Sequence, residues 1–298
     1  NQLRLIKQNL IRKVAFPGQV FSSAALLTRF YQEHMPFELT NAQKQVIREI
    51  FADMRSGKQM NRLLQGDVGS GKTIVAFISM LLAIDNGAQT CLMAPTEILA
   101  DQHYQGLKKF ADLLGITIAK LTGSVKKKDR VGLHEDLQSG KLQILVGTHA
   151  LFEDSVQFKN LGMCIIDEQH RFGVAQRAKL WDKNKEFHPH ILVMTATPIP
   201  RTLAMTAFGD LDYSVMDELP PGRQPIKTVH RYETSRASVM DFVKTEITKG
   251  RQAYYVYPLI EESEKMSYED LMQGYEQVKS FFPEPKYKIS MVHGKQKS

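Results

Sequence analysis

The most informative segment of the chain is Gly66-Asp67-Val68-Gly69-Ser70-Gly71-Lys72-Thr73, because it satisfies the pattern G-x-x-x-x-G-K-[ST]. Its glycines let the backbone adopt positive φ, so that successive N–H groups converge on phosphate oxygens at the positive end of the following helix. Lys72 adds a point charge to this cradle, and Thr73 adds a hydroxyl for Mg²⁺. All eight residues are therefore predicted to bind a nucleoside triphosphate.

The residues on either side have the order that such a loop requires, which is strand, loop and helix. A short apolar run, 62–65, enters the loop, and an apolar stretch of helical period, 74–84, leaves it. Further strand-like runs are expected at 90–94, 118–121, 144–147, 163–166 and 191–194. This alternation predicts an α/β fold over residues 36–222, with a parallel sheet and helices on both of its faces.

Pro220-Pro221-Gly222 predicts a break between two units, since two prolines and a glycine stop any regular element. The second unit, 223–298, is expected to be incomplete. Its elements are predicted as strands at 226–229, 252–259 and 289–292 and helices at 239–248 and 271–281. Residues 1–35 are expected to form a helical connecting arm, broken at Pro17-Gly18.

The composition is that of an ordinary globular protein, with 43% hydrophobic and 24% charged residues. No apolar stretch has the length that crosses a bilayer, and the polar start lacks a signal-peptide core, so a cytoplasmic protein is expected. The net charge of +7 suits a polyanionic partner. Cys91 and Cys164 fall in apolar strand-like runs without metal-ligand spacing, which predicts buried free thiols.

An acidic pair follows the strand expected at 163–166. Asp167 is predicted to hold Mg²⁺ through its coordination shell, and Glu168 to polarise the water that attacks the γ-phosphate. His170 is predicted to report the state of that phosphate to neighbouring loops. Acidic pairs at strand ends are common in α/β proteins, so the assignment depends on the phosphate loop that precedes the pair.

A coupling segment is predicted at Thr195, Ala196 and Thr197, at the end of another buried strand, where it would touch Glu168 and His170. A threonine-capped turn before Pro198 is the alternative. Upstream, Gln43 is predicted to hydrogen-bond the edge of an adenine base and Phe37 to stack on it, although Gln43 alone has the pattern of an exposed helix residue.

The ends of three further strands, with one basic run, are predicted to hold a nucleic-acid backbone without reading its bases. The residues assigned to this contact are Pro95, Thr96, Gly123, Lys126, Lys127, Lys128, Thr148 and His149. A basic run is often solvated surface only, but its place beside a nucleotide-binding core favours phosphate contact.

Taken in order, these segments resemble the motor of superfamily 2 helicases and translocases, and within that group the RecG-type helicases of branched DNA. The resemblance covers most of the chain from residue 36 onward. It is carried by QGDVGSGKT (65–73), MAPTEILA (93–100), GTHALF (147–152), IIDEQHRFGV (165–174), MTATPIPRTLAMTA (194–207), DELPPGR (217–223) and LIEESE (259–264). Gln169 and the LIEESE segment favour the RecG type over the transcription-repair coupling translocases.

This resemblance implies a RecA-like P-loop NTPase domain at 36–222 and part of a second RecA-like domain at 223–298. ATP and Mg²⁺ would bind in the cleft between them. The implied activity is that of an ATP-dependent DNA helicase that regresses replication forks and migrates Holliday junctions in recombination and repair. The resemblance adds Arg201 to the coupling segment. It further implies action as a monomer, single-stranded DNA-binding protein as a partner, and a place at the bacterial nucleoid.

By the same resemblance, residues 1–35 would connect to a preceding wedge domain. Arginines that reach the γ-phosphate would lie beyond residue 298, so the chain alone is expected to bind ATP, to hydrolyse it poorly and not to unwind DNA. Two alternatives stay open at this point. One is a duplex translocase of the coupling type, and the other is a DNA-binding module that ATP gates without being hydrolysed.

Overall fold

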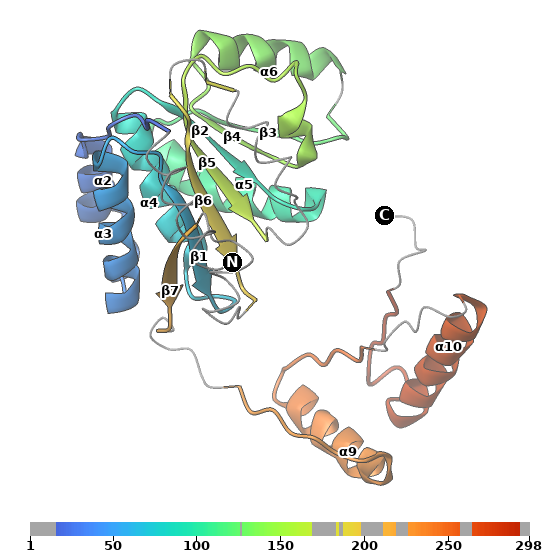
Figure 1. The fold of residues 1–298 in the computed structure, drawn as a ribbon. Helices are drawn as coiled ribbons and strands as arrows, with labels where there is room; N and C mark the ends of the chain where they lie inside the picture. Colours follow the sequence, from blue (N-terminus) through green and yellow to red (C-terminus); the bar gives the residue numbers. More distant parts are fainter. Residues whose placement is uncertain are drawn as a thin grey trace, which may run out of the picture. The chain divides into compact units, whose positions relative to one another are not determined.

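The computed structural model describes residues 16–125, 127–168, 183–184, 187–197, 211–218, 226–256 and 264–292, with the backbone alone for 127 and 264–271. The chain divides into two compact units, Asn1–Arg223 and Gln224–Ser298. Both are drawn in Figure 1.

The first unit is built on a sheet in which the described residues form seven strands in the order β3-β4-β2-β5-β6-β1-β7. Every pair of neighbours is parallel. The strands are β1 (Asn61–Gly66), β2 (Gln89–Met93), β3 (Ile118–Leu121), β4 (Ile144–Gly147), β5 (Leu161–Asp167), β6 (His190–Thr195) and β7 (Asp212–Met216). The predicted α/β fold with a parallel sheet is confirmed, and six strands lie where the sequence predicted them.

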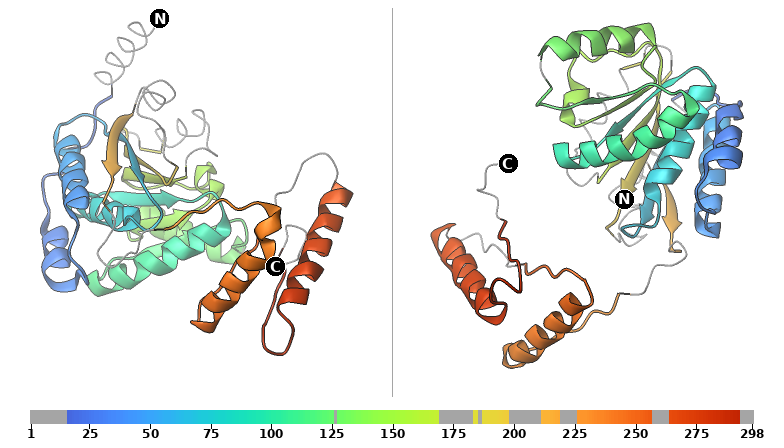
Figure 2. Two further views of the ribbon diagram at one scale, coloured as in Figure 1. Left: turned by 90° about the horizontal axis from the view of Figure 1, so that it is seen from below. Right: turned by 180° about the vertical axis from the view of Figure 1, so that it is seen from behind.

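Side chains that alternate along the central strands enter two separate cores, because helices and loops cover both faces of the sheet. Ile165 and Leu192 face a core with α2 (Ala25–Arg29), α3 (Asn41–Arg55), α4 (Lys72–Asp85) and α5 (Glu97–Leu114). Cys164 and Ile191 face the other core, with α6 (Lys127–Ser139) and the 3-10 turn η2 (His149–Phe152). In the view from behind in Figure 2, α4 and α5 lie across the near face of the sheet. Both cysteines are free and buried, as predicted.

Residues 16–34 pack into the first unit. Phe21 and Phe30 are fully buried, and the Phe30 ring meets the Phe77 ring of α4 edge to face at 5.1 Å between centroids. The π-helical turn η1 (Phe30–His34) follows α2. The part of the expected connecting arm that the structure describes therefore contributes to the core of this unit.

A buried histidine joins this segment to the sheet. His190 Nδ1 accepts a hydrogen bond from the Met60 N–H at 2.9 Å, and His190 Nε2–H donates to the Gln19 carbonyl at 2.7 Å. Burial lowers the pKa of His190 from 6.5 to about 4. The neutral ring is therefore part of the folded structure.

A buried arginine joins β1 to its neighbours. Arg62 donates to the carboxylates of Glu49 at 3.0 Å and Asp53 at 2.8 Å on α3, and to the hydroxyl of Ser214 on β7 at 2.7 Å. β7 is not among the strands predicted from the sequence, because its residues, DYSVM, mix polar and apolar side chains as in a half-exposed edge strand.

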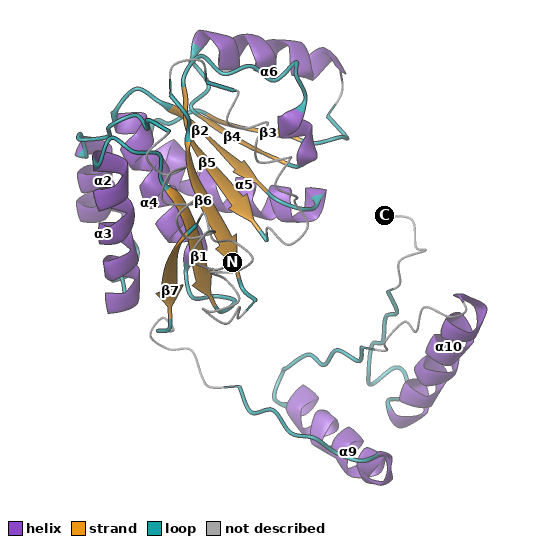
Figure 3. Cartoon of the chain, in the orientation of Figure 1, coloured by secondary structure: helices purple, strands orange, loops and turns teal. Residues whose placement is uncertain are grey.

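The second unit contains the short η4 (Glu233–Ser235), α9 (Arg236–Thr248) and α10 (Glu264–Phe281) among its described residues, and Figure 3 draws these parts as helices and loops. Met240, Val278 and Phe282 are buried between them. The predicted strands at 226–229, 252–256 and 289–292 are wrong, since these residues form no strand. A strand needs a hydrogen-bonded neighbour, and the described part of this unit supplies none. Residues 257–259 lie outside the described part.

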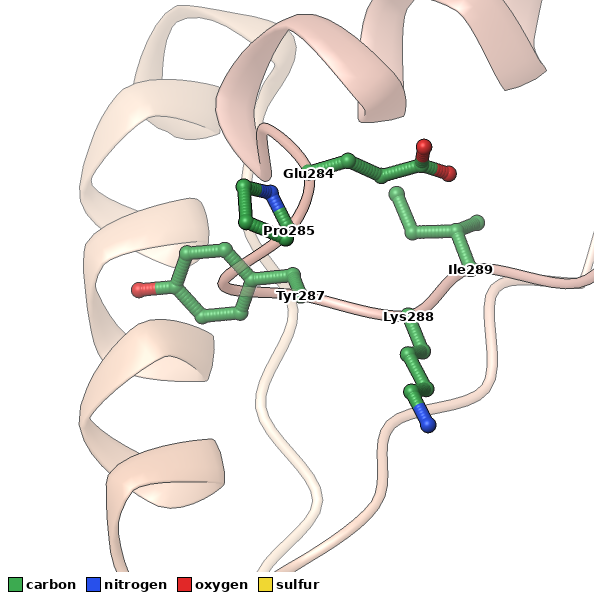
Figure 4. Close-up of a pocket in the computed structure, with 5 residues that line it drawn as sticks. All are labelled: Glu284, Pro285, Tyr287, Lys288 and Ile289. Atoms are coloured by element: carbon green, nitrogen blue, oxygen red, sulfur yellow. The ribbon is translucent and has the colours of Figure 1, made fainter.

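One shallow pocket of about 300 Å³ lies in this unit, beside the loop that follows α10 (Figure 4). It is lined by Glu284, Pro285, Tyr287, Lys288 and Ile289. None of these residues belongs to the predicted site, whose residues all lie in the first unit.

Candidate functional site

Because all seven strands are parallel, the loops at their carboxyl ends meet at one edge of the sheet, where open α/β sheets bind ligands. β1, β6 and β5 are neighbours, so the phosphate loop, the Thr195 segment and Asp167 share one half of that edge. β2, β4 and β3 are neighbours on the other half, where residues 94–96, 122–125 and 148–152 follow them. The predicted nucleotide and nucleic-acid contacts therefore lie side by side.

The phosphate loop runs from the end of β1 into the first turn of α4. Gly69 and Gly71 have φ of 78° and 91°, which only glycine adopts without strain. The Lys72 ammonium donates to the carbonyls of Gly66 at 2.6 Å and Asp67 at 3.0 Å, and thus lies in the concavity of its own loop. The backbone has the form that phosphate binding needs.

Gln43 braces this loop from α3. Its side chain is 2% exposed, its Oε1 accepts from the Thr40 N–H at 2.9 Å, and its Nε2 donates to the Ser70 carbonyl at 2.8 Å. A Cβ on Gly71 would come within 2.3 Å of Gln43 Nε2. The adenine contact of Gln43 stays a prediction, as does that of Phe37, which is 48% exposed. The contact between Gln43 and Ser70 was not predicted from the sequence.

The acidic pair closes the same half of the edge. Asp167 Oδ2 lies 2.7 Å from His103 Nε2 of α5, and the two side chains are 13% and 12% exposed. Glu168 has a φ of 53°, a strained value for a residue with a side chain, and its N–H donates to the Met194 carbonyl at 2.9 Å. This backbone bond ties the end of β5 to β6.

The Glu168 carboxylate meets the predicted coupling segment directly. Its Oε1 accepts from the Ala196 N–H at 3.0 Å, and its Oε2 accepts from the Thr195 hydroxyl at 3.4 Å. The Thr197 N–H donates to that hydroxyl at 3.1 Å. The structure thus brings Glu168 and this segment together, whereas His170 and Arg201 lie outside the described residues.

On the other half, one carboxylate ties two loops together. Thr96 caps α5 by accepting from the Leu99 N–H at 3.3 Å. Glu97 accepts from the Ser124 N–H at 3.2 Å and from the Ser124 hydroxyl at 2.9 Å, and it lies beside Gly123. Pro95 is half-buried in the same loop.

An arginine holds the second of these loops. Arg130 donates to the Thr122 carbonyl at 3.0 Å, to the Val125 carbonyl at 3.1 Å and to the Glu153 carboxylate at 3.1 Å. It therefore acts inside the protein, although it belongs to the basic run. Lys128 is exposed.

The remaining residues predicted to contact nucleic acid differ in their exposure to solvent. His149 is exposed, whereas Thr148 is 2% exposed and its hydroxyl is buried, so this hydroxyl does not face the surface. Lys126 lies outside the described residues, as does the side chain of Lys127.

Thr73 and Asp167 offer a hydroxyl and a carboxylate oxygen, the hard donors that Mg²⁺ takes beside waters and phosphates. This donor set fits the metal that the sequence predicts. Within the described ranges no group of three or more His, Cys, Asp or Glu side chains is arranged to hold a metal by itself. Nor does any described helix have the length and apolar character to span a membrane.

Comparison with known proteins finds a matching family model and similar curated proteins. The family model described as DEAD/DEAH box helicase matches residues 40–206. Among curated proteins, the ATP-dependent DNA helicase RecG of Aquifex aeolicus is 50% identical over 88% of this chain and 33% of its own length. RecG of Bacillus subtilis is 50% identical over 93% of the chain and 40% of its own length.

Among solved structures, RecG bound to a three-way DNA junction is similar, with a TM-score of 0.79 and 40% identity over 94% of this chain and 36% of that chain. The DUF1998 helicase MrfA, at 18% identity and a TM-score of 0.59, shows the likeness of fold alone. The chain thus spans well under half the length of the RecG proteins that it matches.

Proposed function

The chain belongs to the DEAD/DEAH box helicase family and is similar to RecG helicases over most of its length, and from this premise we propose that it is the ATP-binding motor part of a branched-DNA helicase. The proposed activity is ATP hydrolysis that drives movement on DNA forks and Holliday junctions. The observation that carries the enzymatic part is the Glu168 carboxylate, which is bonded to Thr195 and Ala196 beside the phosphate loop.

In this proposal the loop amides of residues 66–71 and the N-terminus of α4 bind the phosphates, and the Lys72 ammonium moves from its loop carbonyls to the phosphate oxygens. Thr73 and Asp167 would hold Mg²⁺, which neutralises phosphate charge when bound. Glu168 orients and polarises the attacking water. Phe37 and Gln43 would contact the base, and Gln43 at the same time fixes the loop through Ser70.

The hydrogen bonds of Glu168 to the segment 195–197 would couple ATP hydrolysis to movement of that segment. When hydrolysis consumes the water that Glu168 orients, the hydrogen bonds of the Glu168 carboxylate change. The Ala196 amide and the Thr195 hydroxyl, which donate to the same two oxygens, would then shift. His170 and Arg201 are proposed to extend this coupling. The second unit is proposed to be part of a second RecA-like domain that moves against the first.

The DNA backbone is proposed to lie across the other half of the edge. Pro95, Thr96, Gly123 and His149 would supply loop contacts there, together with the lysines 126–128. The Glu97 bond to Ser124 would keep two of these loops at a fixed spacing. RecG bound to a three-way junction is the relative that suggests branched DNA as the substrate. By the same likeness we propose a monomer and single-stranded DNA-binding protein as a partner.

The test is ATP hydrolysis by the full-length protein, at one fixed salt concentration, with single-stranded DNA, linear duplex and a three-way fork. We expect the fork to stimulate hydrolysis most. Equal stimulation by linear duplex would replace the proposal with a duplex translocase. If none of the three DNA substrates supports any ATP hydrolysis, the proposal would be replaced by a DNA-binding module that ATP gates without being hydrolysed.

A further inference from the structure

One contact at the nucleotide half of the edge has no part in the roles assigned so far. His103 of α5 reaches the carboxylate of Asp167 at the end of β5, at 2.7 Å between Nε2 and Oδ2. These residues are 64 positions apart in the sequence. Both side chains are nearly nine-tenths buried, so the pair is shielded from competing water.

The face of α5 that carries His103 explains why the contact forms. Ala100 and Leu107 are buried against the sheet, and His103 stands three residues after the first and four before the second. It therefore shares their face of the helix. A polar ring on an otherwise apolar face is expensive unless its nitrogen finds a partner, and Asp167 is that partner.

The Asp167 carboxylate in turn requires a contact that fixes its orientation. Asp167 is the last residue of β5, and its side chain can turn about two torsions toward either the phosphate loop or the helix. The bond to His103 holds Oδ2, which leaves Oδ1 as the oxygen that can face a hydrated metal ion. Carboxylates that serve metals are commonly fixed in this way by a hydrogen bond from behind.

We propose that His103 is a positioning residue for the Mg²⁺ of the nucleotide site, through its Nε2–H bond to Asp167. The inference rests on the function proposed above and adds to it a residue of α5. The same helix begins at Thr96 and Glu97, the loop proposed to contact DNA. One rigid helix therefore connects the DNA half of the edge to the metal-holding carboxylate.

The experiment measures metal dependence rather than turnover. The 298-residue chain is titrated with a fluorescent ATP analogue, first in EDTA and then at increasing Mg²⁺, and Mn²⁺ binding to the protein–nucleotide complex is followed separately by electron paramagnetic resonance. The variants are His103→Leu, which removes the donor, His103→Asn, whose amide is too short, and His103→Gln, whose amide reaches the position of Nε2.

We expect His103→Leu and His103→Asn to raise the Mg²⁺ and Mn²⁺ concentrations for half-saturation by roughly 10-fold or more. Binding in EDTA should equal that of the unchanged chain, and His103→Gln should recover most of the metal affinity. If His103→Asn folds and keeps the original metal dependence, or if His103→Gln is as poor as His103→Leu, the positioning role is wrong. Failure of the unchanged chain to bind nucleotide would overturn the proposed function itself, and this inference with it.

Discussion

Protonation of His190 should weaken the first unit in mildly acidic solution. The ring is fully buried between the sheet and the segment that precedes α2, and it uses Nδ1 as an acceptor and Nε2–H as a donor. A second proton would remove the acceptor for Met60 and place a charge in the core. Burial therefore lowers the pKa of His190 from 6.5 to about 4.

The sign and size follow from linkage. Because the unfolded chain binds the proton first, this contribution to stability is complete above pH 6.5 and is lost as the pH falls toward 4. A difference of 2.5 pKa units, from 6.5 to about 4, corresponds to about 3 kcal/mol in total, of which about 2 kcal/mol is gone at pH 5.

The assay is urea unfolding followed by circular dichroism at pH 7.5 and pH 5, for the unchanged chain and for His190→Asn. Asparagine retains an acceptor and does not titrate. The pH dependence of the variant therefore reports the contribution of all the other titratable groups. We expect the unchanged chain to lose about 2 kcal/mol more between the two pH values than the variant loses. Equal losses would refute the assignment of a buried neutral histidine.

Four further substitutions test the rest of the structure. Arg62→Met should lower the free energy of unfolding by about 2–4 kcal/mol, because two half-buried carboxylates lose their ion pair with the Arg62 guanidinium, and neutralising both of them should restore part of this in the same urea assay. Gly71→Ala should weaken the binding of a fluorescent ATP analogue by about 10-fold or more, since its Cβ would strike Gln43 at a φ of 91°, and unchanged affinity would contradict that geometry. Lys128→Ala should reduce the salt slope of DNA binding by roughly 1, whereas Arg130→Ala should instead lower the melting temperature, and the reverse pattern would exchange their roles.

Much of the first unit could be predicted because its central strands β4, β5 and β6 are mostly apolar. A parallel sheet covered on both faces leaves no polar alternation, so runs such as 163–166 and 191–194 stand out from the polar loops around them. The loop 66–73 then fixes the order of strand, loop and helix. β7 lacks this signal because it lies at the edge of the sheet, with Val215 exposed.

The strands predicted beyond residue 223 show where such reasoning fails. Residues 252–256 and 289–292 have the β-branched and aromatic side chains of strands, but a strand forms only with a neighbour to pair with. Tyr254 and Val256 are 86% and 87% exposed in the described part of the second unit. Local pattern alone does not supply the long-range partner.

The candidate site was predicted as separate segments, and the structure supplies the bonds between them. His103, Glu97 and Arg130 were not assigned roles, because each of them has a carboxylate or hydroxyl partner more than 20 positions away in the sequence. The one signal that pointed to His103 is its place on the buried face of α5. A polar side chain on the apolar face of a helix is the sequence pattern that indicates a residue with a buried polar partner, such as His103.

We propose that this edge of the sheet binds Mg²⁺-ATP with separate roles for Lys72 and Glu168. The most direct test of this proposal is the affinity of the chain for a fluorescent ATP analogue with Mg²⁺, measured for Lys72→Ala, Glu168→Gln and, as a matched control, Lys109→Ala at an exposed position of α5. We predict a loss of about 10-fold or more for Lys72→Ala only, since that residue alone among the three meets the phosphates. Equal affinity in all four proteins, or equal loss in the Lys72 and Glu168 variants, would contradict these separate roles.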